Sequence, residues 1–147
     1  MELTIDQALQ QGVAAHKEGK LQEAERLYRA ILQTQPTHPD ANHNLGVIAV
    51  SVNKTQAALP LLKTALDANP NHRQFWLSYI DALIKGKQFD NAKEVIDQGK
   101  KRGLASEKVD ALEAQLMLIT EVGESKLSEQ KKRLTFAEKR KKLSEKK

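Results

Sequence analysis

Cysteine is absent from the 147 residues, and this absence excludes two classes of chemistry. Without cysteine the chain has no disulfide framework, no thiol nucleophile and no thiolate metal ligand. Long apolar runs are missing too: no stretch of 18 apolar residues occurs, and the first residues lack the basic and apolar regions of a signal peptide. The sequence therefore predicts a soluble, unsecreted protein of the reducing cytoplasm that does not enter a membrane.

Motifs for catalysis and for metal or cofactor binding are lacking as well. The histidines, His16, His38, His43 and His72, form no pair at i, i+4 spacing, and no cysteine is available to complete a zinc site. No glycine-rich phosphate loop follows a strand pattern, and no serine stands in a nucleophile elbow. We therefore predict no metal, no cofactor and no enzymatic activity for this chain.

A spacing of 34 residues is the strongest positive feature. It relates glycine, alanine, large apolar and proline positions: Gly12 with Gly46, Ala24 with Ala58 and Ala92, Tyr28 with Leu62 and Ile96, and Pro36 with Pro70. A fixed period of this length indicates supersecondary units whose apolar faces are covered only by their neighbours. The pattern predicts a solenoid.

The period and its phases resemble the tetratricopeptide repeat, a helix-turn-helix unit, most clearly at Leu45-Gly46 and at Trp76-x-x-Tyr79. The resemblance covers residues 5–104 and implies an all-α, right-handed solenoid. Its three repeats are expected at about 5–38, 39–72 and 73–104. A capping helix at about 106–122 completes a predicted domain of residues 1–122.

Individual residues predict local features of this solenoid. Thr4 and Gln7 form a capping box pattern at the start of the first helix. Gly19 and Asn53 share the phase of a left-handed turn between helices, whereas the third repeat has its glycine one position early, at Gly86, which predicts a different turn.

The glycines inside helices, Gly12 and Gly46, predict close helix crossings at which Ala24 and Ala58 are the facing small residues. In the third repeat Ile80 faces Ala92, so its helices are expected to cross at a wider distance. The bulkier core predicted for this repeat consists of Trp76, Tyr79, Leu83, Phe89 and Ile96.

The resemblance implies a groove lined by the first helix of each repeat, which holds an extended peptide or a partner helix. Asn44 is the residue expected to contact a peptide backbone, above an apolar floor of Val47, Leu77 and Ile84, with Asp81 as a charge that selects partners. The implied groove residues are Asp6, Leu9, Gln10, Val13, His16 and Lys17 in the first repeat, Asp40, His43, Asn44, Val47, Val50 and Ser51 in the second, and Gln74, Leu77, Ser78, Asp81, Ile84 and Lys85 in the third.

Other family members clamp the C-terminal carboxylate of a peptide with lysine, asparagine and arginine side chains. Only Asn44 matches that set here, because the other phases hold Leu9, Val13, Gln74 and Ser78. The sequence therefore argues against a carboxylate clamp. Its primary prediction is a non-catalytic module that binds a protein or peptide, and self-association through an exposed end is left open.

Two further interpretations remain. Asn44-Leu45-Gly46 resembles the repeats of O-linked N-acetylglucosaminyltransferases, and residues 72–118 resemble the N-terminal repeat blocks of larger bacterial glycosyltransferase-like, sulfotransferase or methyltransferase proteins. On that interpretation the chain is the substrate-recruiting module of a larger transferase, and residues 123–147 are a linker.

The last interpretation concerns the charge of residues 124–147, which carry ten Lys or Arg against four Glu. Such a basic tail favours salt-sensitive binding of anions or nucleic acid. Against it, Phe136 is the tail's single aromatic residue and the tail has no sustained amphipathic face. We therefore expect neither nucleic acid nor a membrane as the partner.

Overall fold

The computed structural model describes residues 2–122, and this part of the chain is all α-helical. The tail predicted at residues 123–147 lies outside the described residues. Six labelled helices are followed by a seventh at residues 107–122, called here the 107–122 helix. The labelled helices are α1 (Ile5–Lys17), α2 (Leu21–Thr34), α3 (Pro39–Ser51), α4 (Thr55–Ala68), α5 (Arg73–Lys85) and α6 (Phe89–Lys101).

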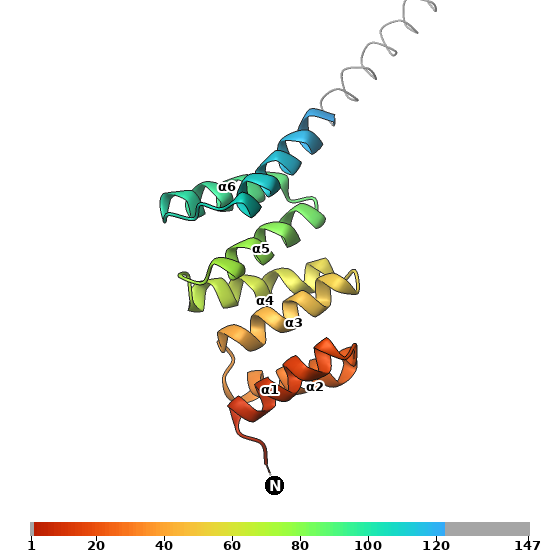
Figure 1. Ribbon diagram of the computed structural model, residues 1–147. Helices are drawn as coiled ribbons and strands as arrows, with labels where there is room; N and C mark the ends of the chain where they lie inside the picture. Colours follow the sequence, from red (N-terminus) through yellow and green to blue (C-terminus); the bar gives the residue numbers. More distant parts are fainter. Residues whose placement is uncertain (1, 123–147) are drawn as a thin grey trace, which may run out of the picture.

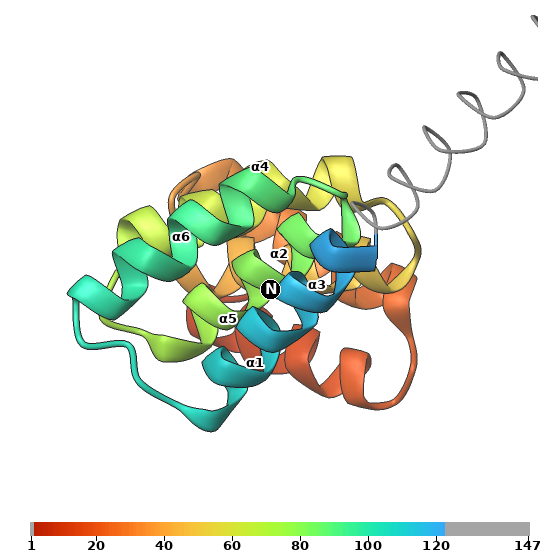
Figure 2. The same cartoon turned by 90° about the horizontal axis from the view of Figure 1, so that it is seen from above.

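The helices stack in chain order into a solenoid, from α1 at one end to the 107–122 helix at the other (Figure 1). Consecutive helices are in contact, and α3 also contacts both α1 and α5 directly. In the view along the stack, α4 and α6 lie on one side, while α1, α5 and the 107–122 helix lie on the other (Figure 2). The first helices of successive repeats therefore form one layer, whose surface is shared by several repeats.

Side chains just outside the helices define where several of them begin. Thr4 and Gln7 form the predicted capping box at the start of α1. At the start of α3, His38 Nδ1 accepts a hydrogen bond from the Ala41 amide at 3.1 Å. Ser106 Oγ accepts one from the Val109 amide at 3.2 Å and caps the 107–122 helix.

The turns inside the three repeats share one backbone conformation. Gly19, Asn53 and Lys87 have φ angles of 79°, 63° and 61°, and they follow each other at the 34-residue spacing. The different turn expected from Gly86 was therefore a wrong prediction, because Lys87 adopts the left-handed conformation at the regular phase. Gly86 is the residue before it and ends α5.

Both predicted close crossings occur, but the facing residues differ from the prediction. A Cβ added to Gly12 would lie 2.6 Å from Cε1 of Tyr28, and one added to Gly46 would lie 2.7 Å from Cγ of Leu62. Large side chains of the second helix, and not Ala24 or Ala58, therefore fill the space that these glycines leave. The distance from the added Gly46 Cβ to the Ala58 carbonyl oxygen, 3.5 Å, is an ordinary contact.

A hydrogen bond that the sequence analysis did not anticipate recurs where repeats join. Asn42 Nδ2 donates to the Pro36 carbonyl at 3.0 Å, and Trp76 Nε1 donates to the Pro70 carbonyl at 2.8 Å. Both the donors and the prolines are 34 residues apart. Two chemically different side chains therefore tie the interrepeat loop to the next helix in the same way.

The third repeat and the 107–122 helix share a continuous hydrophobic core. Trp76, Leu83 and Ile96 are buried in it as predicted, with Tyr79 and Phe89 packed against it. Val109 and Leu116 of the 107–122 helix belong to the same core, while Met117, Leu118 and Val122 are exposed. This helix covers the last repeat with one face and leaves another uncovered.

The 107–122 helix is also tied to the repeats by charge, since Glu113 forms an ion pair with Lys100 of α6. None of the helices within residues 2–122 is both long enough and apolar enough to cross a lipid bilayer.

Candidate peptide-binding groove

The candidate site begins with a hollow of about 450 Å³ between α3 and α5, called here the α3–α5 hollow. All of its lining residues except Leu62 were predicted as groove residues from the sequence. These are His43, Val47, Val50 and Ser51 of α3, with Gln74, Ser78, Asp81 and Lys85 of α5. Side chains from two repeats therefore meet at one surface, as the 34-residue spacing predicted.

A chain of polar contacts crosses the bottom of this hollow. Gln74 Nε2 donates to Ser78 Oγ at 3.1 Å, and Ser78 Oγ lies 2.7 Å from His43 Nε2. His43 Nδ1 lies 3.1 Å from Asn44 Oδ1, an atom that can only accept, so Nδ1 carries the proton and Nε2 accepts from the Ser78 hydroxyl. Asn44 Nδ2 in turn points to the Tyr28 hydroxyl at 3.5 Å.

The surroundings of His43 favour this neutral form. Burial lowers the pKa of His43 below its usual value, the nearby His72 lowers it further, and the hydrogen bond to Asn44 and the charge of Asp40 partly oppose the shift. The ring also packs at 4.8 Å from the ring of Phe75, which stacks in turn on His72 at 4.1 Å. His43 is therefore fixed as an uncharged hydrogen-bonding group between two repeats.

The charges that line this hollow largely balance each other. Asp81 and Lys85 form an ion pair along α5 at 2.9 Å, and both side chains remain partly exposed. Apart from this pair the lining is neutral and consists of small apolar and polar groups. The α3–α5 hollow consequently offers hydrogen bonds and apolar contact more than net charge.

The groove extends onto the 107–122 helix through a second hollow of about 330 Å³, called here the α5–107 hollow. Gln74, Leu77, Ser78 and Asp81 face Lys108, Ala111, Leu112 and Gln115 across it. Each residue of the second set follows one of the first by 34 residues. Sequence analysis treated this helix as a cap only and missed these four positions, although extending the period by one step identifies them.

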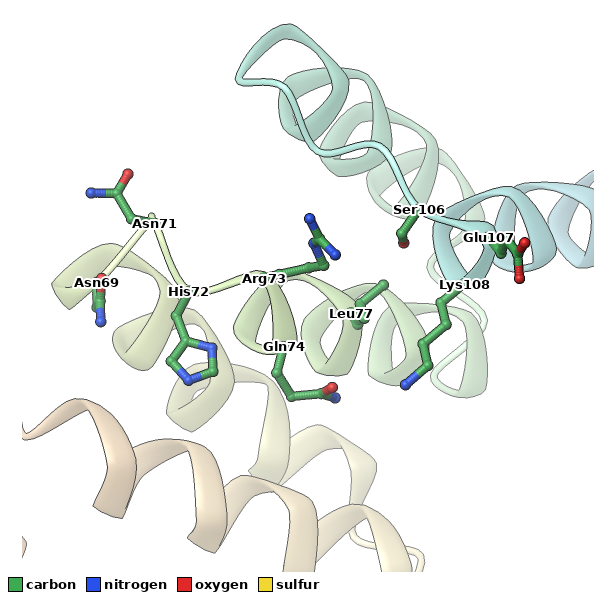
Figure 3. A pocket seen from close by; sticks show the side chains of 9 residues that line it. All are labelled: Asn69, Asn71, His72, Arg73, Gln74, Leu77, Ser106, Glu107 and Lys108. Carbon is green, nitrogen blue, oxygen red and sulfur yellow. The ribbon is translucent and has the colours of Figure 1, made fainter.

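A third hollow of about 730 Å³ lies at the amino-terminal ends of α5 and the 107–122 helix (Figure 3). It is called here the amino-end hollow, and it joins the α5–107 hollow because Gln74, Leu77 and Lys108 line both. Its other lining residues are Asn69, Asn71, His72, Arg73, Ser106 and Glu107. The three hollows together are called the groove below.

The remaining predicted groove residues lie outside these hollows. Gln10 and Lys17 are exposed on α1, as is Asp6, while Leu9, Val13 and His16 are half-buried there. On α3, Asp40 is exposed and Asn44 belongs to the polar chain beneath the groove. Ile84 is only 4% exposed and belongs to the hydrophobic core, where it packs instead of lining a hollow.

Comparison with known families agrees with this architecture. Residues 49–116 match a tetratricopeptide repeat model. The chain is a tetratricopeptide repeat protein. The match begins in α3 and ends within the 107–122 helix, so this repeat protein carries family features in the same helices that form the groove.

Solved structures of other repeat proteins share the fold over most of the chain. The Sgt2 tetratricopeptide domain of Aspergillus fumigatus superposes with a TM-score of 0.73 at 19% identity, covering 82% of both chains. MamA AMB-1 gives 0.70 at 26% identity over 85% of this chain and 74% of that one. The first such domain of Spaghetti (RPAP3), bound to the HSP90 peptide SRMEEVD, gives 0.71 at 15% identity, over 82% and 98%. No curated protein sequence matches the chain.

Proposed function

We propose that this tetratricopeptide repeat protein is a non-catalytic interaction module that binds an extended peptide segment of a partner in the groove. The observation that carries the proposal is the composition of the α3–α5 hollow, whose lining comes from equivalent positions of two repeats. A surface built from equivalent positions suits a ligand that is itself extended and regular.

The groove has the groups that such a ligand needs. Gln74 and Gln115 present exposed amides, which donate and accept hydrogen bonds as a peptide backbone does. Val47, Val50, Leu77 and Leu112 add apolar contact between them. We therefore expect a partner segment with small apolar side chains and an accessible backbone.

The structure-based proposal assigns Asn44 a different role from the one expected from the sequence. Its amide oxygen faces His43 and its amide nitrogen faces Tyr28. Asn44 thereby supports the tautomer of His43, while Gln74, which lines all three hollows, takes over as the candidate for backbone contact.

The RPAP3 domain, solved with an HSP90 peptide, supports a short extended peptide as the kind of ligand. The phases used by carboxylate-clamp members hold Leu9, Val13, Gln74 and Ser78 in this chain, so we propose a different class of peptide. The cytoplasmic location, the link to a larger transferase and the role of the basic tail stay predictions.

A selection from a random library of displayed 12-residue peptides on the full chain tests the proposal. Gln74→Trp fills the groove from an exposed position, and we expect it to weaken the selected peptides at least about tenfold, as loss of roughly 1.4 kcal/mol implies. Gln98→Trp places the same side chain on the exposed surface of α6, outside the groove, and should leave the dissociation constant unchanged. Equal affinity of both variants for every selected peptide would refute groove binding.

A further inference from the structure

The amino-end hollow differs from the rest of the groove in its charge. Arg73, from the first turn of α5, and Lys108, from the first turn of the 107–122 helix, both line it and are both exposed. In Figure 3 their side chains lie on either side of Leu77, and Lys108 extends back toward α5. Two cations from different helices therefore border one part of the groove.

Neither cation is neutralised by a neighbour among residues 2–122. The ion pairs formed there involve other lysines and arginines, including Lys85 with Asp81 in the α3–α5 hollow. Glu107 is the one carboxylate lining the amino-end hollow, and Figure 3 shows its carboxylate pointing away from Arg73 and Lys108. The hollow thus has a positive wall with no internal counterion.

A third cation extends this wall. Arg102 lines an adjoining hollow of about 260 Å³, for which Arg73 and Asn71 form the shared border. The side-chain amides of Asn69 and Asn71 add neutral hydrogen-bond donors around the same space. Guanidinium, ammonium and amide donors converging on one hollow are complementary to a carboxylate.

We propose that Arg73 and Lys108 bind the side-chain carboxylate of an Asp or Glu in the peptide that occupies the groove. This inference rests on the proposed peptide-binding function and adds a charge preference at one defined place. A side chain is favoured over a C-terminal carboxylate because the adjoining hollow behind Arg73 leaves room for the peptide to continue. The rest of the groove remains nearly neutral, so the acidic residue acts as an anchor at one end.

The test uses peptides selected on the wild-type full chain, synthesised with amidated C-termini. We expect an Asp or Glu at one common position, and replacing it with Lys should weaken binding at least about fivefold, the upper range for one exposed ion pair. The double variant Arg73→Glu/Lys108→Glu should reverse this preference and bind the Lys peptide more tightly than the acidic one. Thermal unfolding followed by circular dichroism verifies that each variant is folded.

A matched control changes the net charge equally without touching the groove. Arg26→Glu/Lys93→Glu alters one arginine and one lysine exposed on α2 and α6, and it should keep the wild-type preference for the acidic peptide. Reversal of the preference by this control as well would show a long-range charge effect and overturn the assignment to Arg73 and Lys108.

The remaining outcomes separate this inference from the function on which it rests. Peptides that lose affinity with Gln74→Trp but show no acidic preference would overturn the anchor and leave groove binding intact. Binding that requires a free C-terminus, and not the acidic side chain, would likewise overturn the side-chain assignment. If no selected peptide responds to Gln74→Trp, the proposed function fails and the anchor fails with it.

Discussion

Glycine at position 46 shows how a single residue can be chosen against its own helix propensity. In the middle of a helix glycine costs about 1 kcal/mol relative to alanine. Here the missing side chain makes room for Leu62, which is fully buried against the α3 backbone. The same relation holds between Gly12 and Tyr28, so packing between the helices of a repeat outweighs helix propensity at this phase.

We predict that Gly46→Ala destabilises the protein by about 1 to 3 kcal/mol, because the new Cβ would overlap Leu62 and force either α3 or α4 to move. Urea unfolding monitored by circular dichroism measures this loss. In a Leu62→Ala background, which itself costs about 2 to 5 kcal/mol, the same substitution should cost nothing or even stabilise the helix. An equal cost in both backgrounds would contradict the proposed contact.

The turn residue Lys87 illustrates what sequence analysis misses at this scale. Glycine and asparagine at positions 19 and 53 indicate a left-handed turn because they tolerate a positive φ. Lysine carries no such indication, yet Lys87 adopts a φ of 61° because the two helices on either side of it must meet in the same way as in the other repeats. The requirement of the repeat overrides the local preference of the residue.

At the scale of the element, the loops that join repeats depend on a hydrogen bond from the next helix. Asn42 donates to the carbonyls of Pro36 and His38, at 3.0 and 2.9 Å, and is only 3% exposed. Trp76 makes the equivalent bond to Pro70 at the next junction. Because proline ends each repeat in an extended loop, this bond orients the helix that follows.

We predict that Asn42→Leu destabilises the protein by about 1 to 3 kcal/mol, since it leaves the buried Pro36 carbonyl without its donor at nearly unchanged side-chain volume. Thermal and urea unfolding both report this loss. Asn91→Leu is the matched control, because Asn91 is exposed on α6 and bonds only to the exposed Gln88 side chain, so its effect should stay within about 0.5 kcal/mol. Similar losses in the two variants would remove the special role of the junction.

At the scale of the whole molecule, the solenoid gains its stability from contacts between neighbouring helices. The 107–122 helix illustrates this, because Val109 and Leu116 insert into the core formed by α4, α5 and α6, while its other face has no neighbour among the described helices. It is at once the cover of the last repeat and one wall of the groove. Loss of its packing should therefore affect stability and binding together.

We predict that Leu116→Ala, at a fully buried position, lowers the free energy of unfolding by about 2 to 5 kcal/mol. Leu118→Ala, made two residues later where the side chain is 63% exposed, should change it by no more than about 0.5 kcal/mol. Urea unfolding of both variants measures the difference. Equal effects would mean that the helix does not pack on the last repeat through the face described.

The groove itself could be predicted in part. Equivalent phases of the second and third repeats identified His43, Val47, Ser78 and Asp81, because a helical repeat places equal phases on one face. Ile84 shares that phase pattern but lies in the core, since whether a face is covered depends on the neighbouring helices. The role of Lys108 was missed because its helix was predicted to act only as a cap.

The amino-acid sequence by itself determined the period, the all-α solenoid, the main helices and the surface that they share, because these follow from spacing and from the preferences of each residue for helix or turn. Only the tertiary structure decided which side chains fill the glycine crossings, which donors hold the proline loops and where the positive wall of Arg73 and Lys108 forms. These features depend on distances between residues of different helices. Such distances are set by packing, and periodicity along the chain does not contain them.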